Sequence, residues 1–569
     1  MSTPAATVES VLRPSPGSRA ETPGPSAAPE AREERPVPPA PAASAPAPDG
    51  MPLWRTLVYV LGATILGLAQ GLGNNLISAN IPQLQGAFGA TTAEVMWLVA
   101  AYMAPNVSLT LLLIKIRTQF GLRRFAEISI PIFLLVSTLH LAVDELSSAI
   151  IVRFIAGAAA APMSTLCFLY MLEPFPPARK LSVALPLVMV VLGLGMPVAR
   201  LVSPTLLDHG WHGLYLIEVA MALLSFAVVY LLPLTPVPRE KVIQPMDIVS
   251  YLMIALGFGL TAIVLCFGRI KWWTEAPWLG VSLAVAAAAL TVAVAIELNR
   301  KTPLVDFRWL VSREMLVFTG ALLVFRIALS EQTSGAFYFF QALGLLNEQM
   351  STLLWIVTGA TIAAGLACAL VLKPGREPAI HMVALMLLAA GALMDAQATN
   401  LTRPAQMYVS QALIAAASAL FMPAALHLGL MTTLKRGRHY ILSFVIVFLT
   451  TQSIGGLLGS SLLGSFVVLR QNVHLNELIG HLALSDPVAA QRVNALSGAY
   501  AQVITDPALR QAEGLRLLST QATREACVLA YNDLFLLVAC VATLALVALI
   551  IHVAVRAARQ RMTPEPATA

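Results

Sequence analysis

Charged residues are scarce in this chain. Only 12% of its 569 residues are Asp, Glu, Lys or Arg, whereas an average soluble domain has about 25%. Hydrophobic residues make up 57%, and the mean hydropathy is +0.76. This deficit excludes a chain built of ordinary soluble domains. Apolar runs of 18 or more residues recur almost end to end, which predicts an all-α membrane protein with many spans.

The chain also lacks the patterns of several other protein classes. Its five cysteines show no CxxC and no paired spacing, so we expect neither a disulfide framework nor a metal site. GxxxxGK[ST] is absent, which argues against ATP as the energy source, and HExxH, GxSxG and Cys/His zinc spacings are absent too. We therefore expect no cofactor and no enzyme activity. No cleavable signal peptide is predicted, because the N-terminus has no apolar core.

Most of the chain is predicted to lie in the membrane. Residues 1–53 are expected to be a disordered cytoplasmic tail, because this Pro-, Ala- and Ser-rich segment has too little apolar surface to offset the entropy of ordering. Fourteen spans follow, each long enough to cross roughly 30 Å of hydrocarbon. Their approximate limits are 57–79, 95–115, 125–142, 148–171, 181–203, 213–234, 249–268, 278–297, 315–341, 351–372, 379–396, 405–432, 440–468 and 528–556.

Lys and Arg predict the orientation. The net charge of +6 comes from short basic clusters between apolar runs, such as Arg123 and Arg124 after span 2, so nucleic acid is not an expected partner. With the N-terminus inside, these clusters fall on inner loops, and the short outer loops hold only Arg269, Lys271 and Arg403. By the positive-inside rule, both termini are cytoplasmic and the number of spans is even.

The spans divide the chain into parts. We expect two six-helix bundles, at 54–240 and 301–560, with two extra spans at 241–300 between them and a cytoplasmic tail at 561–569. Inside the second bundle, the long outer loop 470–525 has apolar residues at helical spacing.

That outer loop is expected to form about two amphipathic helices lying against the outer face, as a packing lid or a docking surface. A short interfacial helix is expected at 303–314, with Trp309 at headgroup depth.

Several local patterns agree with one family. In span 4, "VRFIAGAAAAP" places Arg153 four residues before Gly157, and in span 5 "GLGMP" holds Gly193, Gly195 and Pro197. "LGNNLISANIP" in span 1, "TTQSIGGLLGSSLLGS" in span 13 and "AYNDLF" at the start of span 14 add to these. With fourteen spans and both termini inside, the chain resembles the larger drug:proton antiporters of the major facilitator superfamily, the EmrB/QacA-type exporters.

The resemblance implies a major facilitator fold, proton-coupled export of a small organic compound, a functional Arg153 and a gating segment at the span 5 glycines. It also implies a periplasmic adaptor and an outer-membrane channel as candidate partners in organisms with two membranes. Three positions depart from the pattern, the first being Ile114, which stands where the motif around the loop after span 2 usually has its first glycine. Gly73 stands where span 1 usually carries an acid, and Thr118 stands where the loop after span 2 usually does. Arg123 and Arg124 keep the basic part of that cytoplasmic gating loop.

Charges inside the spans point to a pathway. A charge at the bilayer centre costs at least about 2.5–3.5 kcal/mol, so such residues are expected to pair or to border a wet passage. Arg326 lies roughly 17 Å from the inner end of span 9, and Glu331 lies about 7.5 Å further out and about 140° around the helix. The two are therefore expected to face different partners. Glu331 is the predicted proton-binding carboxylate, since desolvation favours the neutral form of such a group.

Other polar residues are candidates for the pathway or for bracing. By depth, Arg153, Arg200, Glu218 and Asp533 could share the outer half with Glu331, although water at the headgroups could also solvate Glu218 and Asp533. Three further residues are expected at the membrane interface: Asp395, His140 and His552. His427 is expected to be a hydrogen-bonded packing residue. Polar residues that line a pathway or hold helices together are Asn74, Asn75, Tyr102, Asn106, Gln332, Gln341, Gln411 and Gln452. The aromatic group 337–340 would line a cavity or form an interfacial belt.

The sequence thus predicts a secondary transporter of the inner membrane, with two bundles rocking around a midplane cavity. Its expected partners are a small-molecule substrate, protons and membrane lipid. Two alternatives stay open. A membrane-embedded transferase would usually carry acidic or histidine clusters in its loops, and 470–525 lacks one. A non-transporting receptor or scaffold with a transporter fold is compatible with the altered loop after span 2.

Overall fold

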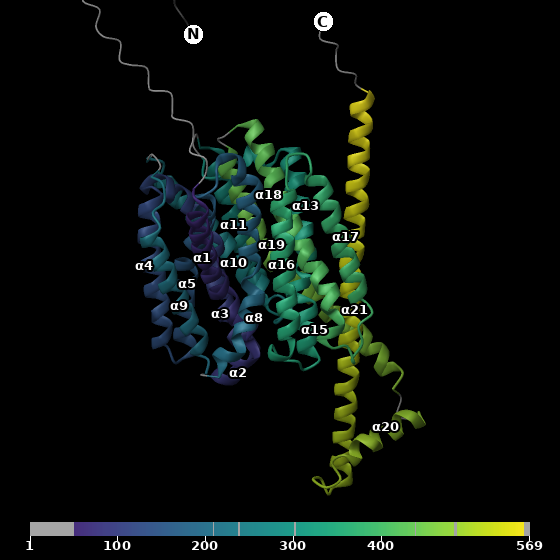
Figure 1. Cartoon of the computed structure of the whole chain (residues 1–569). Helices are drawn as coiled ribbons and strands as arrows, with labels where there is room; N and C mark the ends of the chain where they lie inside the picture. The colour runs from purple at the N-terminus through teal and green to yellow at the C-terminus, as the bar shows by residue number, and fades with distance from the viewer. Residues whose placement is uncertain are drawn as a thin grey trace, which may run out of the picture. The chain divides into compact units, whose positions relative to one another are not determined.

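The computed structural model describes residues 51–562 except 209, 237, 238, 240, 301, 302, 438, 439 and 483–485. The predicted tail at 1–53 lies almost wholly outside the described residues, and so does most of the tail at 561–569. Within the described part, the regular structure is helical and contains no strand (Figure 1). A helix pairs its own backbone groups, which the hydrocarbon core of a membrane requires.

The N-terminal helices alternate in direction through the bundle (Figure 1). They are α1 (Leu53–Ala79), α2 (Ile81–Phe88), α3 (Thr92–Phe120), α4 (Leu122–Leu139), α5 (Leu146–Leu172), α6 (Pro177–Arg179), α7 (Leu185–Gly193), α8 (Gly195–Leu207) and α9 (Gly213–Leu231). The hairpin of α10 (Pro245–Phe267) and α11 (Pro277–Leu298) follows, and α10 packs against α3.

The C-terminal helices begin after this hairpin. They are α12 (Phe307–Leu310), α13 (Arg313–Leu329), α14 (Glu331–Ser334), α15 (Ala336–Ala342), α16 (Ser351–Val371), α17 (Glu377–Asp395), α18 (Tyr408–Arg436), α19 (Ile441–Gly480), α20 (Pro487–Gly498) and α21 (Pro507–Met562).

Local sequence sets where helices begin and end. Thr91 and Glu94 form a capping box at the start of α3, where the Glu94 amide donates to the Thr91 hydroxyl and the Glu94 carboxylate accepts from the Thr91 amide. Gly121, with φ 85°, separates α3 from α4 in a conformation that favours glycine. Pro245 and Pro277 occupy first-turn positions of α10 and α11, where a missing N–H costs nothing.

Thirteen helices among the described residues are long and apolar enough to cross a membrane. Each agrees with a predicted span. The predicted span 315–341 is present as three pieces, α13, α14 and α15, so no single helix covers it. The interruptions fall at Ser330 and Gly335. The described residues therefore form an all-α membrane fold, in which the predicted span 315–341 is broken at two points near its C-terminal end.

Two groups of helices face each other across the middle of the bundle. Within the N-terminal group, α5 packs against α1 and α3; within the C-terminal group, α18 packs against α16 and α17. Between the groups, α7 contacts α16 and α18, and α3 contacts α19. This pairing of N-terminal and C-terminal helices surrounds the site described below.

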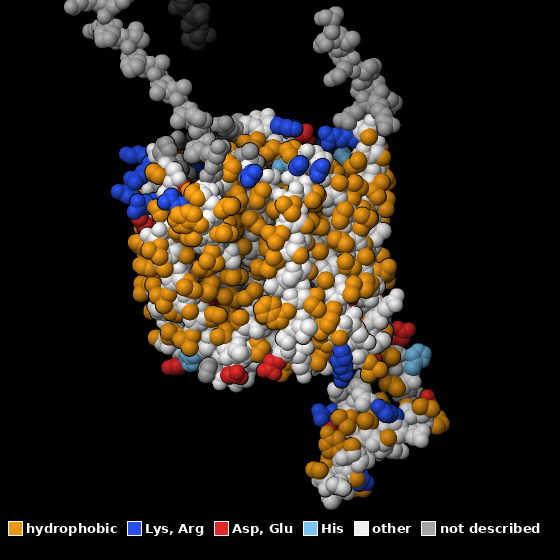
Figure 2. Space-filling model, viewed as in Figure 1, with side chains coloured by type: hydrophobic (Ala, Val, Ile, Leu, Met, Phe, Trp, Pro, Cys, Tyr) orange, Lys and Arg blue, Asp and Glu red, His pale blue; other side chains and the backbone are white. Residues whose placement is uncertain are grey.

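The surface has two chemically different ends. In Figure 2, Lys and Arg side chains gather at the end where α1 begins, which we call the basic end, and acidic side chains lie at the opposite end. Apolar side chains cover the sides between them. Exposed residues such as Leu231 (76%) and Leu370 (81%) belong to this apolar band. Such a band matches a bilayer, and the chain is a multi-pass membrane protein.

The segment 470–525 differs from its prediction. Its helices do not lie against the outer face, because α19 and α21 continue through it as long helices and α20 packs on α21 beyond the bundle (Figure 1). Helical spacing predicted the helices but carries no information about their direction.

Two residues expected at an interface are buried. Trp309, on α12, is 7% exposed and stacks on Tyr440, with ring centroids 5.2 Å apart. His140 is buried against Tyr215, at 4.4 Å between rings. Neighbouring aromatic rings cover both side chains, and their depth at the membrane interface stays a prediction.

The crossing of α3 and α5 depends on Gly157. A Cβ at this position would lie 2.0 Å from the carbonyl oxygen of Tyr102. Backbone cannot yield as a flexible side chain can, so we expect Gly157→Ala to destabilise the protein by at least about 1–3 kcal/mol. Thermal unfolding of the purified protein in detergent measures this. Gly280→Ala on α11, where nothing lies within 4 Å, is the control and should not destabilise the protein. Equal stability of both variants would contradict this packing.

Candidate functional site

A cavity of about 380 Å³ lies between the two groups of helices. Its wall includes amides predicted to line a pathway, namely Asn74, Asn75, Asn106 and Gln452. Methionines from both groups supply flexible apolar surface: Met96, Met103, Met189, Met196 and Met422. A second hollow, away from the basic end, shares Ser78, Ile81, Met96, Arg269 and Tyr338 with the cavity. The cavity is thus amphipathic and extends toward the end opposite the basic end.

Arg326 faces this cavity from α13. Its Nε donates to the carbonyl oxygen of Gln452 at 3.3 Å. Gly455 and Gly456 make room for it, since a Cβ at Gly456 would lie 3.0 Å from Nη2. The prediction that Arg326 and Glu331 face different partners is confirmed, because Arg326 contacts α19 whereas Glu331 points to α18.

Glu331 belongs to a pair of buried carboxylates. The side-chain amide of Gln411 donates to Glu331 Oε1 at 3.2 Å and to Asp395 Oδ2 at 2.8 Å, and Ser410 donates to the other Asp395 oxygen. Glu331 is 0% exposed and Asp395 2% exposed. Asp395, predicted at the membrane interface, is the last residue of α17, and α18 covers this last turn.

The broken span positions Glu331. The carboxylate stands at the start of α14, directly after the end of α13. Gly335 permits the second interruption, since a Cβ there would lie 2.6 Å from the Glu331 carbonyl oxygen and 2.9 Å from its Oε1. Ser334, at the end of α14, lines the cavity. One short helical turn therefore connects the carboxylate pair to the cavity wall.

Arg153 and Glu218 form a buried ion pair in the N-terminal group. Arg153 Nη1 lies 3.2 Å from Glu218 Oε1, and Nη2 donates to the carbonyl oxygen of Gly73 at 2.8 Å. The guanidinium lies over the ring of Tyr102, 4.2 Å from its centroid. Glu218 is 5% exposed, so solvation at the headgroups does not apply. Glu218, on α9, therefore lies close to Gly73, since a Cβ at Gly73 would be 3.8 Å from Glu218 Oε1.

The remaining predicted charges lie elsewhere. Arg200, on α8, donates to Asn347 at 3.1 Å and lies 5.0 Å from the centroid of Phe337. Asn347 donates in turn to the carbonyl oxygen of Ala79, so this contact joins N-terminal and C-terminal helices. The predicted cluster in the outer half therefore divides into separate sites.

Asp533 belongs to another of these sites. It pairs with Arg470 at 2.6 Å and His474 at 2.7 Å, where α19 and α21 lie together. We expect Asp533 to stabilise the packing of α19 against α21 and not to take part in the cavity.

The span 5 glycines stand at a close helix crossing. The break between α7 and α8 falls between Gly193, which lines the cavity, and Gly195. A Cβ on Gly195 would lie 3.0 Å from the Cα of Gly71 on α1. Pro197 is buried in the first turn of α8. Such a crossing lets α1 and α8 approach closely.

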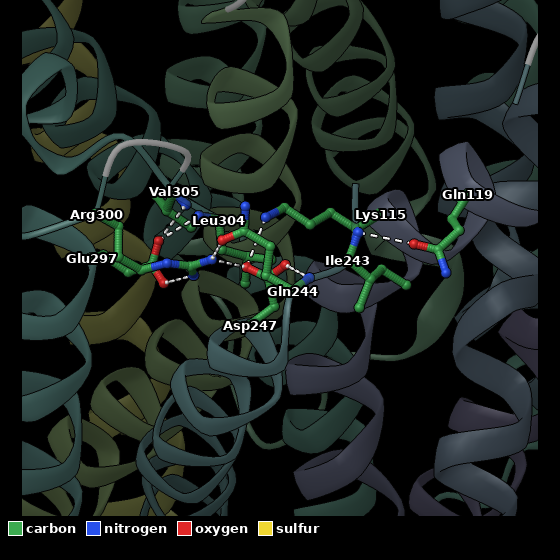
Figure 3. A network of polar contacts seen from close by, with 9 residues as sticks. All are labelled: Lys115, Gln119, Ile243, Gln244, Asp247, Glu297, Arg300, Leu304 and Val305. Atoms are coloured by element: carbon green, nitrogen blue, oxygen red, sulfur yellow. Dashed lines mark hydrogen bonds and ion pairs between the residues drawn. The ribbon is translucent and has the colours of Figure 1, made fainter. Parts of the chain in front are cut away.

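A network of buried charges closes the basic end around the extra hairpin (Figure 3). Asp247 lies 2.7 Å from Lys115 Nζ and 2.5 Å from Arg300 Nη2, and Arg300 Nη1 lies 2.9 Å from Glu297. Asp247 is 0% exposed and Lys115 4% exposed. Two acids face two bases, which balances their charges.

The same network reaches the C-terminal helices. Glu297 accepts from the backbone amides of Leu304 and Val305 (Figure 3). The next amide, of Asp306, donates to the Ser443 hydroxyl on α19 at 3.1 Å. The chain of contacts therefore runs from α3 through α10 and α11 to α19.

The predicted gating arginines lie outside this network. Arg123 is exposed and pairs only with Glu127 one turn away, at 2.7 Å, within the described contacts, and Arg124 is also exposed. The buried network at Lys115, the last residue of the predicted span 95–115, was not predicted from the sequence. A buried Asp at the start of an apolar span was the available signal.

Two smaller predictions are resolved by the packing. His427 is buried and shares a hydrogen bond of 2.9 Å with Glu377, which confirms a hydrogen-bonded packing role. In the aromatic group, Tyr338 lines the cavity, while Phe337, Phe339 and Phe340 are buried in the core. The group is thus mainly core and not an interfacial belt.

Comparisons with known proteins agree with this geometry. The family profile described as Major Facilitator Superfamily matches residues 63–460. The multidrug export protein EmrB of Haemophilus influenzae is 25% identical over 268 residues, which are 46% of this chain and 51% of that protein. The probable multidrug resistance protein EmrY of Escherichia coli is 25% identical over 279 residues, 48% of this chain and 53% of that protein. The chain spans about half the length of these curated relatives.

Among solved structures, one of proton-dependent oligopeptide transporters covers 89% of this chain and 100% of its own, with 13% identity and a TM-score of 0.54. At that identity the likeness concerns the fold alone.

Proposed function

Because the chain belongs to the major facilitator superfamily, we propose that it is a proton-coupled exporter of a small organic compound that works by alternating access. The observation that carries the proposal is a cavity between the two helix groups, bordered by a broken span whose buried Glu331 is joined through Gln411 to Asp395 of α17. Two carboxylates bridged by one amide are suited to hold a proton, because both cannot easily be ionised in an apolar site.

In this mechanism, the bundles 54–240 and 301–560 rock about the cavity. The extra spans at 241–300 move together with the first bundle. Glu331 and Asp395 take up a proton from outside, and substrate leaves the cavity to that side. Protonation removes charge from the start of α14, and α14 transmits the change to Ser334 in the cavity wall. Release of the proton inside resets the pair.

The basic end is the cytoplasmic end in this proposal. The Lys and Arg side chains gathered there in Figure 2 fit the positive-inside rule, and both termini are then cytoplasmic. The protein resides in the inner membrane, and the helical hairpin of α19, α20 and α21 lies outside. Its relatives' names as multidrug exporters support export as the direction of transport. An adaptor and an outer-membrane channel remain proposed partners for that hairpin.

Two polar contacts act as gates in this proposal, and the first reaches the C-terminal helices only through Glu297 and the backbone amides of Leu304 and Val305. The Lys115–Asp247–Arg300 network closes the basic end, and the Arg200–Asn347 contact holds the opposite end. Alternating access requires that they open in turn. The exposed pair at Arg123 does not take part.

Breaking the inner gate should open the cavity to the cytoplasm. In Lys115→Met, Asp247 and Glu297 outnumber Arg300, so the network is no longer balanced. We expect a cysteine at the cavity residue Thr110, in a background without native cysteines, to react about 5-fold or more faster with a membrane-impermeant maleimide from the cytoplasmic side. Labelling of inverted vesicles measures the rate. Arg123→Met is the control and should leave it unchanged; equal rates in all three proteins would exclude the gate.

The transporter, receptor and transferase functions differ in whether substrate crosses the membrane. Reconstituted in proteoliposomes, a transporter moves substrate across the membrane, whereas a receptor binds it without flux and a transferase converts it. Compounds chosen from a sensitivity screen of cells with and without the protein serve as substrates. Binding without flux would favour the receptor.

A further inference from the structure

The cavity described above carries only positive charge. Among the described residues that line it, Arg269 and Arg326 are the charged ones, and none is Asp or Glu. Buried acids of the described spans have partners elsewhere. Glu218 pairs with Arg153, and Glu331 and Asp395 bind Gln411. The others are Asp247 with Lys115, Glu297 with Arg300 and Glu377 with His427, and the partly buried Asp533 pairs with Arg470. A guanidinium keeps its proton in proteins, so both cations persist at working pH.

Arg326 also has unused donor capacity. Its one described hydrogen bond is from Nε to the backbone of Gln452, and no carboxylate of the described residues lies within ion-pair distance. Nη2 stands beside Gly456, which lines the cavity, and Gly455 lies against the Cβ and Cγ atoms of the same side chain. Arg326 is partly buried, and a cation removed from water without a counter-ion is costly unless an anion from outside pairs with it.

Arg269 marks the route toward the opposite end. It lines both the cavity and the hollow beyond it, 5.1 Å from the ring centroid of Tyr338. Two guanidiniums therefore stand along one path, with methionine side chains between the helix groups available for an apolar body. Like charge excludes organic cations from such a path.

We propose that the substrate is an amphipathic organic anion, with an apolar body against the methionines and a carboxylate or sulfonate paired with Arg326. This deepens the proposed export function and rests on it for transport, while binding can be measured separately. The Nη groups of Arg326 match the two oxygens of such a head group.

A matched pair of compounds tests the charge. Full-length protein in nanodiscs is titrated with 1-naphthalenesulfonate and 1-naphthyltrimethylammonium, and flux of both is followed in proteoliposomes. The sulfonate should bind and move at least about 10-fold better than the ammonium compound. Arg326→Gln should remove that preference, and Arg326→Lys should keep part of it. Arg313→Gln, an exposed arginine of the same helix, is the control and should keep it fully.

The outcomes separate the two proposals. Equal handling of both compounds, or preference for the cation, overturns the anion assignment and leaves export standing if flux is seen. Sulfonate binding that depends on Arg326 but produces no flux supports the anion site and counts against export. A sulfonate preference unchanged in Arg326→Gln, with that variant folded like Arg326→Lys, overturns the assignment of the site.

Discussion

Replacing Glu331 by Gln is expected to abolish the drive that a proton gradient gives to export. The variant keeps a hydrogen-bonding side chain beside Gln411 but cannot exchange a proton. Coupling free energies between two ligands are typically about 1–3 kcal/mol, or about 5–150-fold, and we expect gradient-driven accumulation to fall by a factor in this range. Downhill movement of substrate should persist, because Glu331 does not line the cavity. Asp395→Asn should act in the same direction.

The measurement is substrate flux with simultaneous recording of proton flux in proteoliposomes. Glu314→Gln on α13 is the matched control, since Glu314 is exposed and pairs with Arg436 at the basic end. Its coupling should equal that of the original protein. If both Glu331→Gln and Asp395→Asn move protons and substrate in the original ratio, the carboxylate pair is not the proton site.

Breaking the ion pair between Arg153 and Glu218 is expected to have the largest effect on stability. Arg153→Met leaves Glu218 buried beside Tyr102 without its counter-ion, and the loss of one member of a buried pair typically costs about 3–5 kcal/mol. The yield of folded protein and its unfolding free energy in micelles should fall accordingly. The double variant Arg153→Met, Glu218→Leu should recover much of the loss, because two apolar side chains can replace a buried pair.

A double-mutant cycle on these variants isolates the interaction of the pair. The exposed pair of Arg123 and Glu127 provides the comparison, and Arg123→Met should cause no measurable loss. Equal destabilisation by Arg153→Met and Arg123→Met, or no recovery in the double variant, would show that the pair does not support the fold.

The spans and the chemistry of single residues could be predicted from the sequence. Long apolar runs specify membrane helices because the bilayer leaves no other structure for the backbone. Arg153 and Glu331 stood out because a charge in such a run needs a partner or water. That Arg326 and Glu331 face different partners was predicted from their spacing on one continuous helix, although the helix is interrupted between them at Ser330.

Partners distant in the sequence could not be predicted. Lys115 and Asp247 stand 132 positions apart, and only the packing of α10 on α3 brings them together. The contact of Asp395 with Gln411 was not predicted, because the position of a residue along its span does not show which helix packs over it. Here that helix is α18. The breaks around α14 depend on Gly335 and on tertiary contacts, and a run of apolar residues gives no sign of them.

The central claim, that a proton gradient drives an anion out through the cavity, is tested most directly by collapsing the gradient. In proteoliposomes with an imposed pH difference, uphill movement of 1-naphthalenesulfonate should stop when a protonophore is added, and an opposite gradient should reverse it. Uphill movement that continues without any gradient, or that ignores its direction, would contradict the account.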